Sequence, residues 1–443
     1  MRPQADHGTG RFGLFTLTTV VVASMIGAGV FTTSGFALED LGTPGKVMLA
    51  WALGGFIALT GAKSYGMLVR RIPESGGEYI YLRETVHPLA GFIAGWVSLL
   101  AGFTGAIAFA ASALESYLVP AGIRPDWLPQ DIVALAAVLT AGVMHGLRAA
   151  RGAFWQGIAV VFKVLIIAAF VVYAGYQLAA GAWPGGGDVP LTGTAAFSLP
   201  AFAMSLVWIS LSYSGFNASA YMAGEAVDPR RTVPRSLVLG TLIVFAVYLA
   251  LNSIFVLAPP REAVSGAADV AAVAARALGG GSFAAAARFT IVLALFTSVS
   301  SMVMAGPRVY AKMAEDGLMP KAFEVEEEPP REAIWFQVGL AVLFILLTGI
   351  QQLLSYLGFT LSLTSAAAVT GLFVIHHREG RTPSADRAYP WVPAVYVTAT
   401  VGLAVLAAGE NPVELAGAVA TFLTGTLAYF VIRAVKGRGK RRS

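Results

Sequence analysis

The sequence contains no cysteine, and charged residues fill only 12% of its 443 positions. Without cysteine the chain can form neither a disulfide framework nor a thiolate metal site, and no disulfide can link it to a partner subunit. Soluble domains carry about twice as many charged residues, about 25% of their composition. The low charge therefore excludes the ordinary soluble globular class.

Histidine is also scarce, and common catalytic signatures are missing. The five histidines fall in tails or at the ends of apolar segments, without metal-ligand spacing: His7, His87, His145, His376 and His377. Neither His-Glu-x-x-His nor Gly-x-Ser-x-Gly occurs, which argues against an intramembrane enzyme. We expect structural or interfacial histidines, no metal, no cofactor and no enzymatic activity.

Long apolar segments dominate the sequence, which is 56% hydrophobic with a mean hydropathy of +0.70. Most segments approach the roughly 20 residues that cross a bilayer as a helix. The first is preceded by a polar tail and is too long for a signal peptide, so we expect the amino terminus to be retained. The sequence predicts an all-α polytopic membrane protein with twelve transmembrane helices, over residues 14–37, 46–69, 88–119, 130–147, 153–180, 197–223, 235–258, 283–312, 332–350, 352–377, 390–408 and 411–433.

The basic residues are distributed unevenly between the two sets of connections. One set, which includes both tails, holds 23 of the 30 lysines and arginines, and the opposite set holds five. An excess of positive charge marks cytoplasmic loops. We therefore expect a cell membrane protein, in the inner or plasma membrane, with both termini in the cytoplasm. The tail "RAVKGRGKRRS" predicts contact with anionic membrane lipids, and nothing indicates a nucleic-acid partner.

The first predicted helix contains a candidate interruption, "SMIGAGVF", from Ser24 to Phe31. Gly27 and Gly29 each weaken a helix by about 1 kcal/mol relative to alanine. Backbone groups freed in lipid need partners, so an unwound turn is tolerated only beside protein or a cavity. Close packing against a neighbouring helix is the alternative interpretation of these small residues.

A second interruption lies in the sixth segment, "SLSYSGFNASAY". Gly215 lies 188 residues beyond Gly27, at the matching place of its segment, as a five-plus-five internal repeat requires. Paired, glycine-interrupted segments indicate the central site of a transporter. Exposed amides at one half-helix attract a carboxylate and exposed carbonyls attract an amine, so the pair predicts a site for a zwitterion.

Several motifs in order resemble the amino acid, polyamine and organocation (APC) superfamily of permeases, which have the LeuT-type fold. They are "SMIGAGVF", "IPESGGEYIYL" with the following "GW", "YSGFNASAYMAGEAVDPRRTVPRS" and "PRVYAKMAEDGLMP". The resemblance implies one transmembrane transporter domain over residues 1–433, followed by a basic cytoplasmic tail at 434–443. Within it, 1–180 form the first repeat with its amino-terminal tail, 197–377 the second inverted repeat, and 390–433 two additional helices. Helices 1 and 6 would be broken.

The resemblance also assigns a substrate site to the two interruptions. The carboxylate site falls on Ile26, Gly27, Ala28, Gly29 and Val30, and the amine and side-chain site on Leu211, Ser212, Tyr213, Ser214, Gly215 and Asn217. Leu211 stands where many relatives have a bulky aromatic gate. The central parts of the two helices contain no Asp or Glu, so we expect a neutral amino acid as substrate.

Lys163 lies about 15 Å along its helix, too deep to reach the headgroups easily. Ionisable residues at this depth are functional by default, with snorkelling as the alternative. In the resembling family, a lysine here replaces a sodium ion beside hydroxyls of the eighth helix, for which Ser298, Ser300 and Ser301 are available. We expect sodium-independent transport, in which Lys163 either couples proton movement or holds the broken helix during exchange.

Two other charged residues have simpler interpretations. Lys63, where relatives commonly carry Glu, is expected to snorkel, with Glu225 as a candidate partner. Glu115 is expected to be interfacial. The sequence thus predicts secondary active amino acid transport by alternating access, with proton-coupled symport and exchange both open. An amine, polyamine or ethanolamine permease, an amino acid exporter, and a channel or sensor remain as alternatives.

Overall fold

The structure is a computed structural model that describes residues 12–147, 152–184, 197–315, 317–319, 331–379 and 386–439. Within these ranges the elements are helical apart from one isolated parallel bridge between Phe12 and Ala226. The helices are α1 (Leu14–Met25), α2 (Gly29–Leu41), α3 (Pro44–Arg71), α4 (Gly77–Thr85), α5 (Pro88–Val97), the π-helix η1 (Ser98–Gly105), α6 (Ala106–Leu118), the 3-10 helix η2 (Ala121–Ile123), α7 (Ile132–Leu147), α8 (Gly152–Ala179), α9 (Leu199–Ser212), the 3-10 helix η4 (Ala218–Glu225), α10 (Pro229–Leu257), α11 (Arg261–Val264), α12 (Val270–Glu315), α13 (Arg331–Leu347), α14 (Ile350–Arg378), α15 (Trp391–Ala407) and α16 (Pro412–Gly439).

Six of the described helical stretches are long and apolar enough to cross a membrane, and the bent pair α1 and α2 makes a seventh. Eleven of the twelve predicted ranges overlap one of these or a shorter apolar helix, and the remaining range, 332–350, overlaps α13. Helix α12 begins at Val270 and is kinked at Gly279 and Gly280, so the predicted eighth range, which starts at residue 283, lies in the part of α12 after the kink. The molecule is therefore an all-helical, multi-pass membrane protein.

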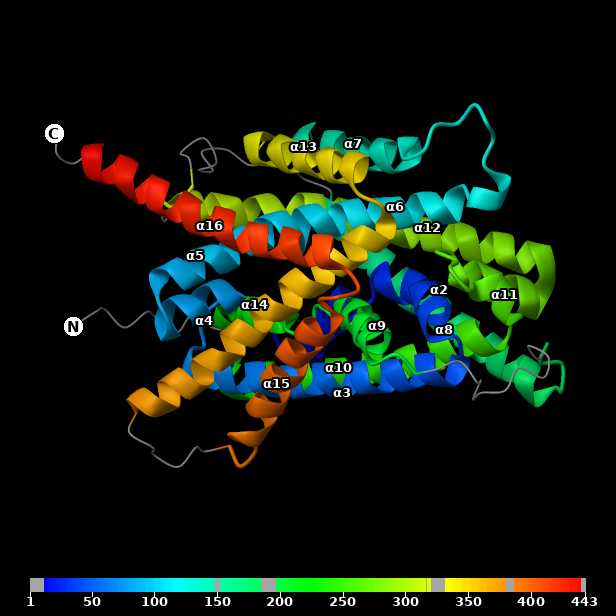
Figure 1. Ribbon diagram of the computed structural model, residues 1–443, viewed down its shortest axis with the longest axis horizontal. Helices are drawn as coiled ribbons and strands as arrows, with labels where there is room; N and C mark the ends of the chain where they lie inside the picture. Colours follow the sequence, from blue (N-terminus) through cyan, green and yellow to red (C-terminus); the bar gives the residue numbers. More distant parts are fainter. Residues whose placement is uncertain are drawn as a thin grey trace.

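The two interrupted segments lie in the middle of the bundle (Figure 1). Helices α1 and α2 pack against α10 and α9 respectively, while α3 and α10 pack along each other on one side. The long α12 packs against α6, and α7 pairs with α13 at the outer edge. This arrangement surrounds the interruptions with protein, which is where unwound backbone in a membrane can be stabilised.

Small residues allow these central helices to approach closely. A side-chain carbon at Gly240 of α10 would lie 2.7 Å from the Val21 side chain of α1. At Gly66 of α3, the same atom would lie 3.0 Å from Pro234 of α10. Glycine at such contacts is the usual way in which membrane helices gain van der Waals packing.

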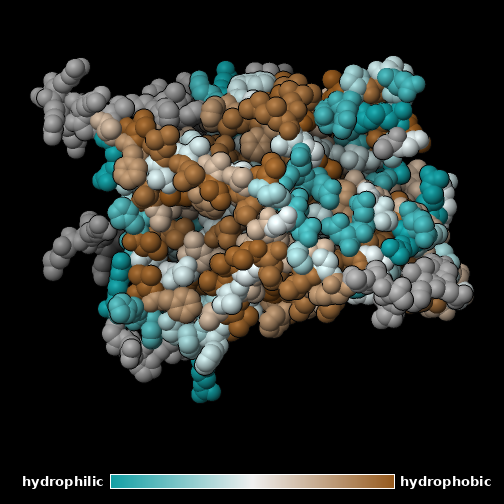
Figure 2. Space-filling view, viewed as in Figure 1, coloured by the Kyte–Doolittle hydropathy of each residue, from teal (hydrophilic) through white to brown (hydrophobic). Residues whose placement is uncertain are grey.

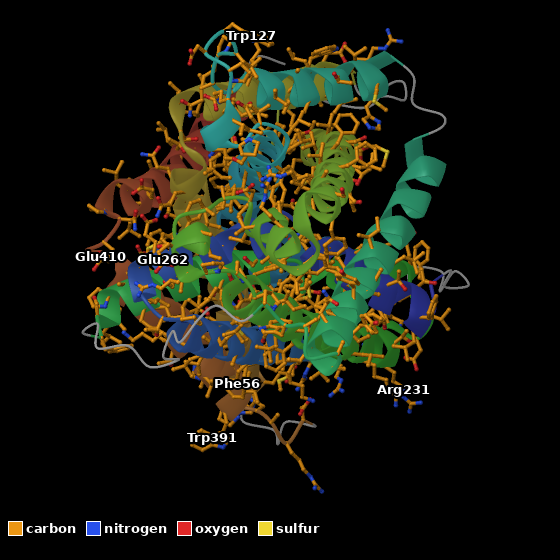
Figure 3. All side chains as sticks on the ribbon, turned by 90° about the vertical axis from the view of Figure 1, so that its right-hand side faces the viewer. Phe56, Trp127, Arg231, Glu262, Trp391 and Glu410 are labelled. Atoms are coloured by element: carbon orange, nitrogen blue, oxygen red, sulfur yellow. The ribbon has the colours of Figure 1, made fainter. Side chains whose placement is uncertain are left out.

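The surface has an apolar middle and polar ends (Figure 2). The described chain begins and ends at the same end of the bundle, on the left in Figure 1. Several arginines at this end share ion pairs, hydrogen bonds or pockets with one another's neighbours, and we call this end of the bundle the arginine-rich end. These arginines are Arg70, Arg71, Arg230, Arg235 and Arg378. Phe56 on α3 and Trp391 at the start of α15 point outward, with 55% and 75% of their surfaces exposed (Figure 3). Exposed rings of this kind contact lipid in a membrane protein.

Candidate functional site

The first predicted helix is interrupted where the glycines indicated. Helix α1 ends at Met25, α2 begins at Gly29, and the two are bent by 42°. Ile26 leaves the helix in an extended conformation, although its amide still donates to the Val22 carbonyl at 3.1 Å. The amino end of α2 has no side-chain cap. Its first amides are thus available to a ligand, because a helix supplies no internal acceptors for them.

The sixth segment is interrupted at the matching place. Helix α9 ends at Ser212, and the chain turns through Tyr213–Asn217 before the short 3-10 helix η4 starts at Ala218. Gly215 has φ +94°, which is a conformation that residues with side chains adopt at a cost. The turn therefore requires glycine at position 215.

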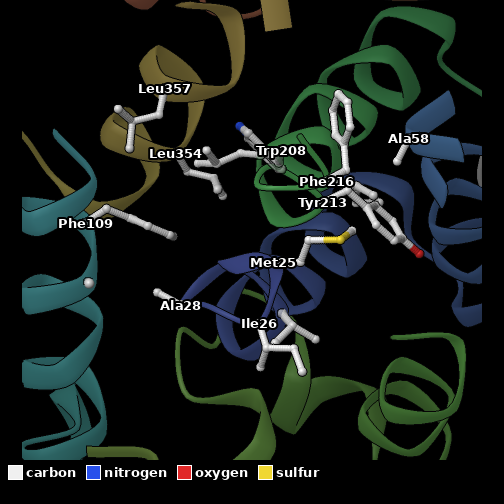
Figure 4. Packing of buried hydrophobic residues seen from close by; sticks show 14 of the residues in the cluster. Met25, Ile26, Ala28, Ala58, Phe109, Trp208, Tyr213, Phe216, Leu354 and Leu357 are labelled. Atoms are coloured by element: carbon white, nitrogen blue, oxygen red, sulfur yellow. The ribbon is translucent and has the colours of Figure 1, made fainter. Parts of the chain in front are cut away.

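The two interruptions touch each other. A side-chain carbon at Gly29 would lie 2.5 Å from the Ser212 hydroxyl oxygen, and one at Gly215 would lie 2.8 Å from the Ser24 carbonyl oxygen. The hydroxyls of Thr33 and Ser212 are hydrogen-bonded at 2.9 Å. Figure 4 shows Met25, Ile26 and Ala28 grouped below Trp208, Tyr213 and Phe216. Glycine at these contacts lets the two backbones meet.

Tyr248, on α10, joins the carbonyl ends of the two interrupted helices. Its hydroxyl lies 2.6 Å from the Met25 carbonyl oxygen and 3.1 Å from that of Ser212. These are the last residues of α1 and α9, whose carbonyls lack partners within their own helices. The tyrosine therefore satisfies backbone that the interruptions expose and fixes their relative position.

Glu78 forms a second junction, beside the second interruption. This carboxylate is buried, with 6% of its surface exposed, and accepts hydrogen bonds from the Tyr65 hydroxyl at 2.6 Å, from the Asn217 side-chain amide and from the Tyr221 hydroxyl. It links α4 to α3 and η4. The motif that contains Glu78 was recognised in the sequence, but only the folded structure brings its carboxylate to Asn217.

The comparison with protein families settles the class of the chain. The model of the amino acid permease family matches residues 12–432. The chain belongs to this family. The resemblance read from its ordered motifs is thereby confirmed, and we refer to the protein below as the permease.

Relatives of the permease are similar along most of its length. It is 26% identical to the serine/threonine exchanger SteT of Bacillus subtilis strain 168, over 88% of this chain and 90% of that protein. It is 24% identical to the large neutral amino acids transporter small subunit 2 of Homo sapiens, over 97% and 82%. For the Asc-type amino acid transporter 1 of Mus musculus, the identity is 24% over 95% and 80%. The family and these relatives are transporters rather than enzymes.

The side chains of the predicted substrate residues point in different directions. Tyr213 is 1% exposed, and its hydroxyl reaches the Trp51 carbonyl at 3.3 Å, so its ring belongs to the core. Asn217 is bound to Glu78, and Leu211 is 9% exposed. By contrast, Gly27 and Ser214 are half-buried and Ser24 is exposed. The accessible residues of this region therefore include small ones, Ser24, Gly27 and Ser214.

The predicted coupling residues are brought together only in part. Lys163 lies in α8, and its side chain is outside the described residues. Ser300 is hydrogen-bonded at 2.7 Å to the ring of His145 on α7, a partner that the sequence did not indicate. Ser298 and Ser301 donate to the carbonyls one turn earlier in α12. The association of Lys163 with these hydroxyls stays a prediction.

Lys63 has a partner that sequence reasoning missed. Its ammonium lies 2.9 Å from a carboxylate oxygen of Asp386, which also accepts a hydrogen bond from Arg70 at 2.8 Å. The suggested pairing with Glu225 was wrong. Burial by itself raises the pKa of Asp386, but the hydrogen bonds from Lys63 and the Ala388 amide and the charges of Lys63 and Arg70 lower that pKa below its ordinary value. Asp386 is thus ionised at neutral pH.

Glu115 lies near the end of α6 and is buried within the protein, with 4% of its surface exposed. It forms an ion pair with Arg124 and accepts hydrogen bonds from the amides of Asp131 and Ala134 at 2.9 and 2.8 Å. These bonds fix the start of α7 to the end of α6. Within the described residues, no cluster of three or more histidine, aspartate or glutamate side chains could hold a metal ion.

Proposed function

We propose that the permease is a secondary active transporter of neutral L-amino acids that works by alternating access. The observation that carries this proposal is the contact between the two interrupted helices, in which Gly29 meets Ser212 and Gly215 meets Ser24. An interruption that served packing alone would not need a matching one beside it. Paired interruptions at one place in the bundle are characteristic of a transporter's central site.

The substrate's carboxylate would bind the amides at the start of α2. Residues Gly27–Val30 supply these amides, and the positive end of the helix dipole favours an anion there. The substrate's ammonium would bind carbonyls of the second interruption, Leu211–Gly215, at the negative end of α9. The substrate side chain would extend toward the second interruption.

The chemistry of the two interruptions favours a substrate without side-chain charge. Neither Ile26–Val30 nor Leu211–Gly215 contains an acidic or basic residue. Glu78, the buried carboxylate nearby, already accepts three hydrogen bonds and is therefore a poor partner for a cationic side chain. Two relatives are named for serine and threonine and for large neutral amino acids, which supports the same class.

We further propose a LeuT-type architecture with two inverted repeats of five helices, in the single transporter domain predicted from the sequence. Residues up to 180 form the first, 197–377 the second, and α15 and α16 are the two additional helices. The matching places of the two interruptions support this division. The arginine-rich end, where the described chain begins and ends, is assigned to the cytoplasmic side of a cell membrane, because positive residues concentrate on that side.

Transport is proposed to be independent of sodium, with either proton-coupled symport or exchange. Lys163 lies within α8, at a position in the sequence that corresponds to the membrane interior. Its ammonium would supply the positive charge that a bound sodium ion supplies in other transporters. The name of the exchanger relative supports exchange.

Counterflow tests the proposed function. Purified permease in liposomes is preloaded with one of the twenty amino acids at a time, and entry of the matching labelled amino acid is followed without sodium. We expect accumulation for a few neutral amino acids and none for arginine or glutamate. Folded protein that is inactive with every amino acid but active with ethanolamine or a polyamine would overturn the proposal.

A further inference from the structure

A pocket of about 470 Å³ opens at the arginine-rich end, and its lining includes no residue of the two interruptions. It lies between α3 and α10, with contributions from Leu14 of α1 and from Asp386. Basic and apolar side chains share its lining: Leu14, Lys63, Gly66, Arg70, Pro234, Arg235, Val238, Leu239, Leu242 and Asp386. One part of the pocket lining is thus cationic and another part is apolar.

Both helices present the same order of side chains on the face that borders the pocket. On α3, residues Leu49, Phe56, Lys63 and Arg70 follow at intervals of seven, which places them on one face. Leu49 and Phe56 are more than half exposed, while Lys63 and Arg70 line the pocket. The face is therefore apolar in the middle of the membrane and cationic toward the end.

Helix α10 repeats this order. Arg235 is followed by Leu239 and Leu242, at helical spacing, and both leucines are more than two-fifths exposed. An exposed apolar wall within a membrane-spanning helix contacts acyl chains. The pocket is thus an extension of the lipid-facing surface.

The pocket lining carries more positive than negative charge. Three cations, Lys63, Arg70 and Arg235, face one carboxylate, Asp386. Lys63 and Arg70 converge on the same oxygen of Asp386, at 2.9 and 2.8 Å. Among the described residues, the side chain of Arg235 forms no ion pair or hydrogen bond. A phosphate at this place would complement the excess charge.

We propose that this pocket binds one anionic phospholipid, with its phosphate among Lys63, Arg70 and Arg235 and an acyl chain along Leu239 and Leu242. Basic pockets between membrane helices suit such headgroups. Asp386 competes with the phosphate for Lys63 and Arg70. Because the lipid would contact Lys63 and Arg70 of α3 and Arg235 of α10, it would connect these two helices. Helix α10 also carries Tyr248, which contacts both interrupted helices.

Native mass spectrometry of the detergent-solubilised permease tests this site, with phosphatidylglycerol and phosphatidylcholine as probes. We expect one phosphatidylglycerol to bind in preference to phosphatidylcholine. Arg235→Gln should weaken phosphatidylglycerol binding about fivefold, the contribution of one basic residue near an anionic headgroup. Arg231→Gln is the matched control, because Arg231 lies one turn before Arg235 in α10 but does not line the pocket.

Asp386→Asn should have the opposite effect to Arg235→Gln and strengthen phosphatidylglycerol binding, because Lys63 and Arg70 lose their ion pairs with Asp386 and can both bind the phosphate. Equal binding of the two lipids by the wild-type protein, or equal effects of the two arginine variants, would overturn the proposal. Displacement of the lipid by excess inorganic phosphate would instead identify a site for free phosphate, and the lipid would be rejected. The comparison of the two lipids needs only the wild-type permease, so the proposal remains testable if a variant does not fold.

Discussion

The Tyr248 hydroxyl lies 2.6 Å from the carbonyl oxygen of Met25, the last residue of α1. The same hydroxyl is 3.1 Å from the Ser212 carbonyl, at the end of α9. One side chain thus caps both helices where they stop. The single hydroxyl proton is shared between the two carbonyls, so this contact offsets part of the cost of interrupting two helices inside a membrane.

Tyr248→Phe removes this cap and retains the ring. We expect a loss of about 1–3 kcal/mol in stability, because buried carbonyls lose their donor, and roughly tenfold slower counterflow. Thermal unfolding in detergent and initial counterflow rates measure the two effects. Tyr356→Phe is the control, since its hydroxyl bonds Thr421 at 2.9 Å, between α14 and α16. If both variants transport equally well, Tyr248 does not position the site.

Gly215→Ala tests the second interruption. The substitution places a side chain at φ +94°, which costs about 1–2 kcal/mol, and brings it 2.8 Å from the Ser24 carbonyl oxygen. We expect counterflow to fall by more than about tenfold as the interruptions separate. Gly339→Ala, where nothing lies within 4 Å, should transport like the wild type. Wild-type activity in Gly215→Ala would show that contact between the interruptions is unnecessary.

Glu78→Gln tests the buried carboxylate. Glutamine has one acceptor oxygen, so it cannot accept from Tyr65, Asn217 and Tyr221 as the carboxylate does. We expect about 1–3 kcal/mol of destabilisation and a changed dependence of counterflow on substrate concentration, because η4 loses its attachment to α4. Glu84→Gln, on the exposed side of α4, is the matched control and should leave both unchanged. An unaltered unfolding temperature for Glu78→Gln would contradict the assignment.

The ion pairs of Asp386 predict a dependence of stability on pH. Its pKa is lower in the folded protein than the ordinary value of 3.8, so the folded state binds its proton less readily than the unfolded state. The stabilisation is therefore present above about pH 4 and is lost as the pH falls through the lowered pKa. Unfolding temperatures of wild type and Asp386→Asn should differ at pH 7 and converge in acid. A constant difference down to about pH 2 would contradict this prediction.

Lys163→Ala tests the coupling hypothesis drawn from the sequence. If Lys163 couples proton movement, the variant should lose the dependence of uptake on an imposed pH gradient while it still binds substrate. If Lys163 holds the interrupted helix, exchange itself should slow. Arg331→Ala, at the start of α13, is a control for loss of one positive charge. Normal transport by Lys163→Ala, insensitive to both pH and sodium, would exclude both possibilities.

The sequence by itself determined the membrane class, the helical segments and the two interruptions. Apolar runs of about 20 residues, and the glycines within them, are local properties of the sequence. They predict helices and breaks because a segment must be about that long to cross the bilayer and must satisfy its backbone hydrogen bonds there. Gly27, Gly29 and Gly215 were therefore found without any knowledge of packing. The ordered motifs added the family, which the match over residues 12–432 confirms.

Only the tertiary structure decided which residues meet. Tyr248 reaches Met25 across 223 positions, and Lys63 pairs with Asp386 rather than Glu225. Glu78 collects donors from α3 and η4, and Ser300 bonds His145. A hydrogen bond or ion pair requires atoms within about 3 Å, and that proximity follows from how the helices pack against one another. The local sequence around each residue does not determine which distant residue it will contact.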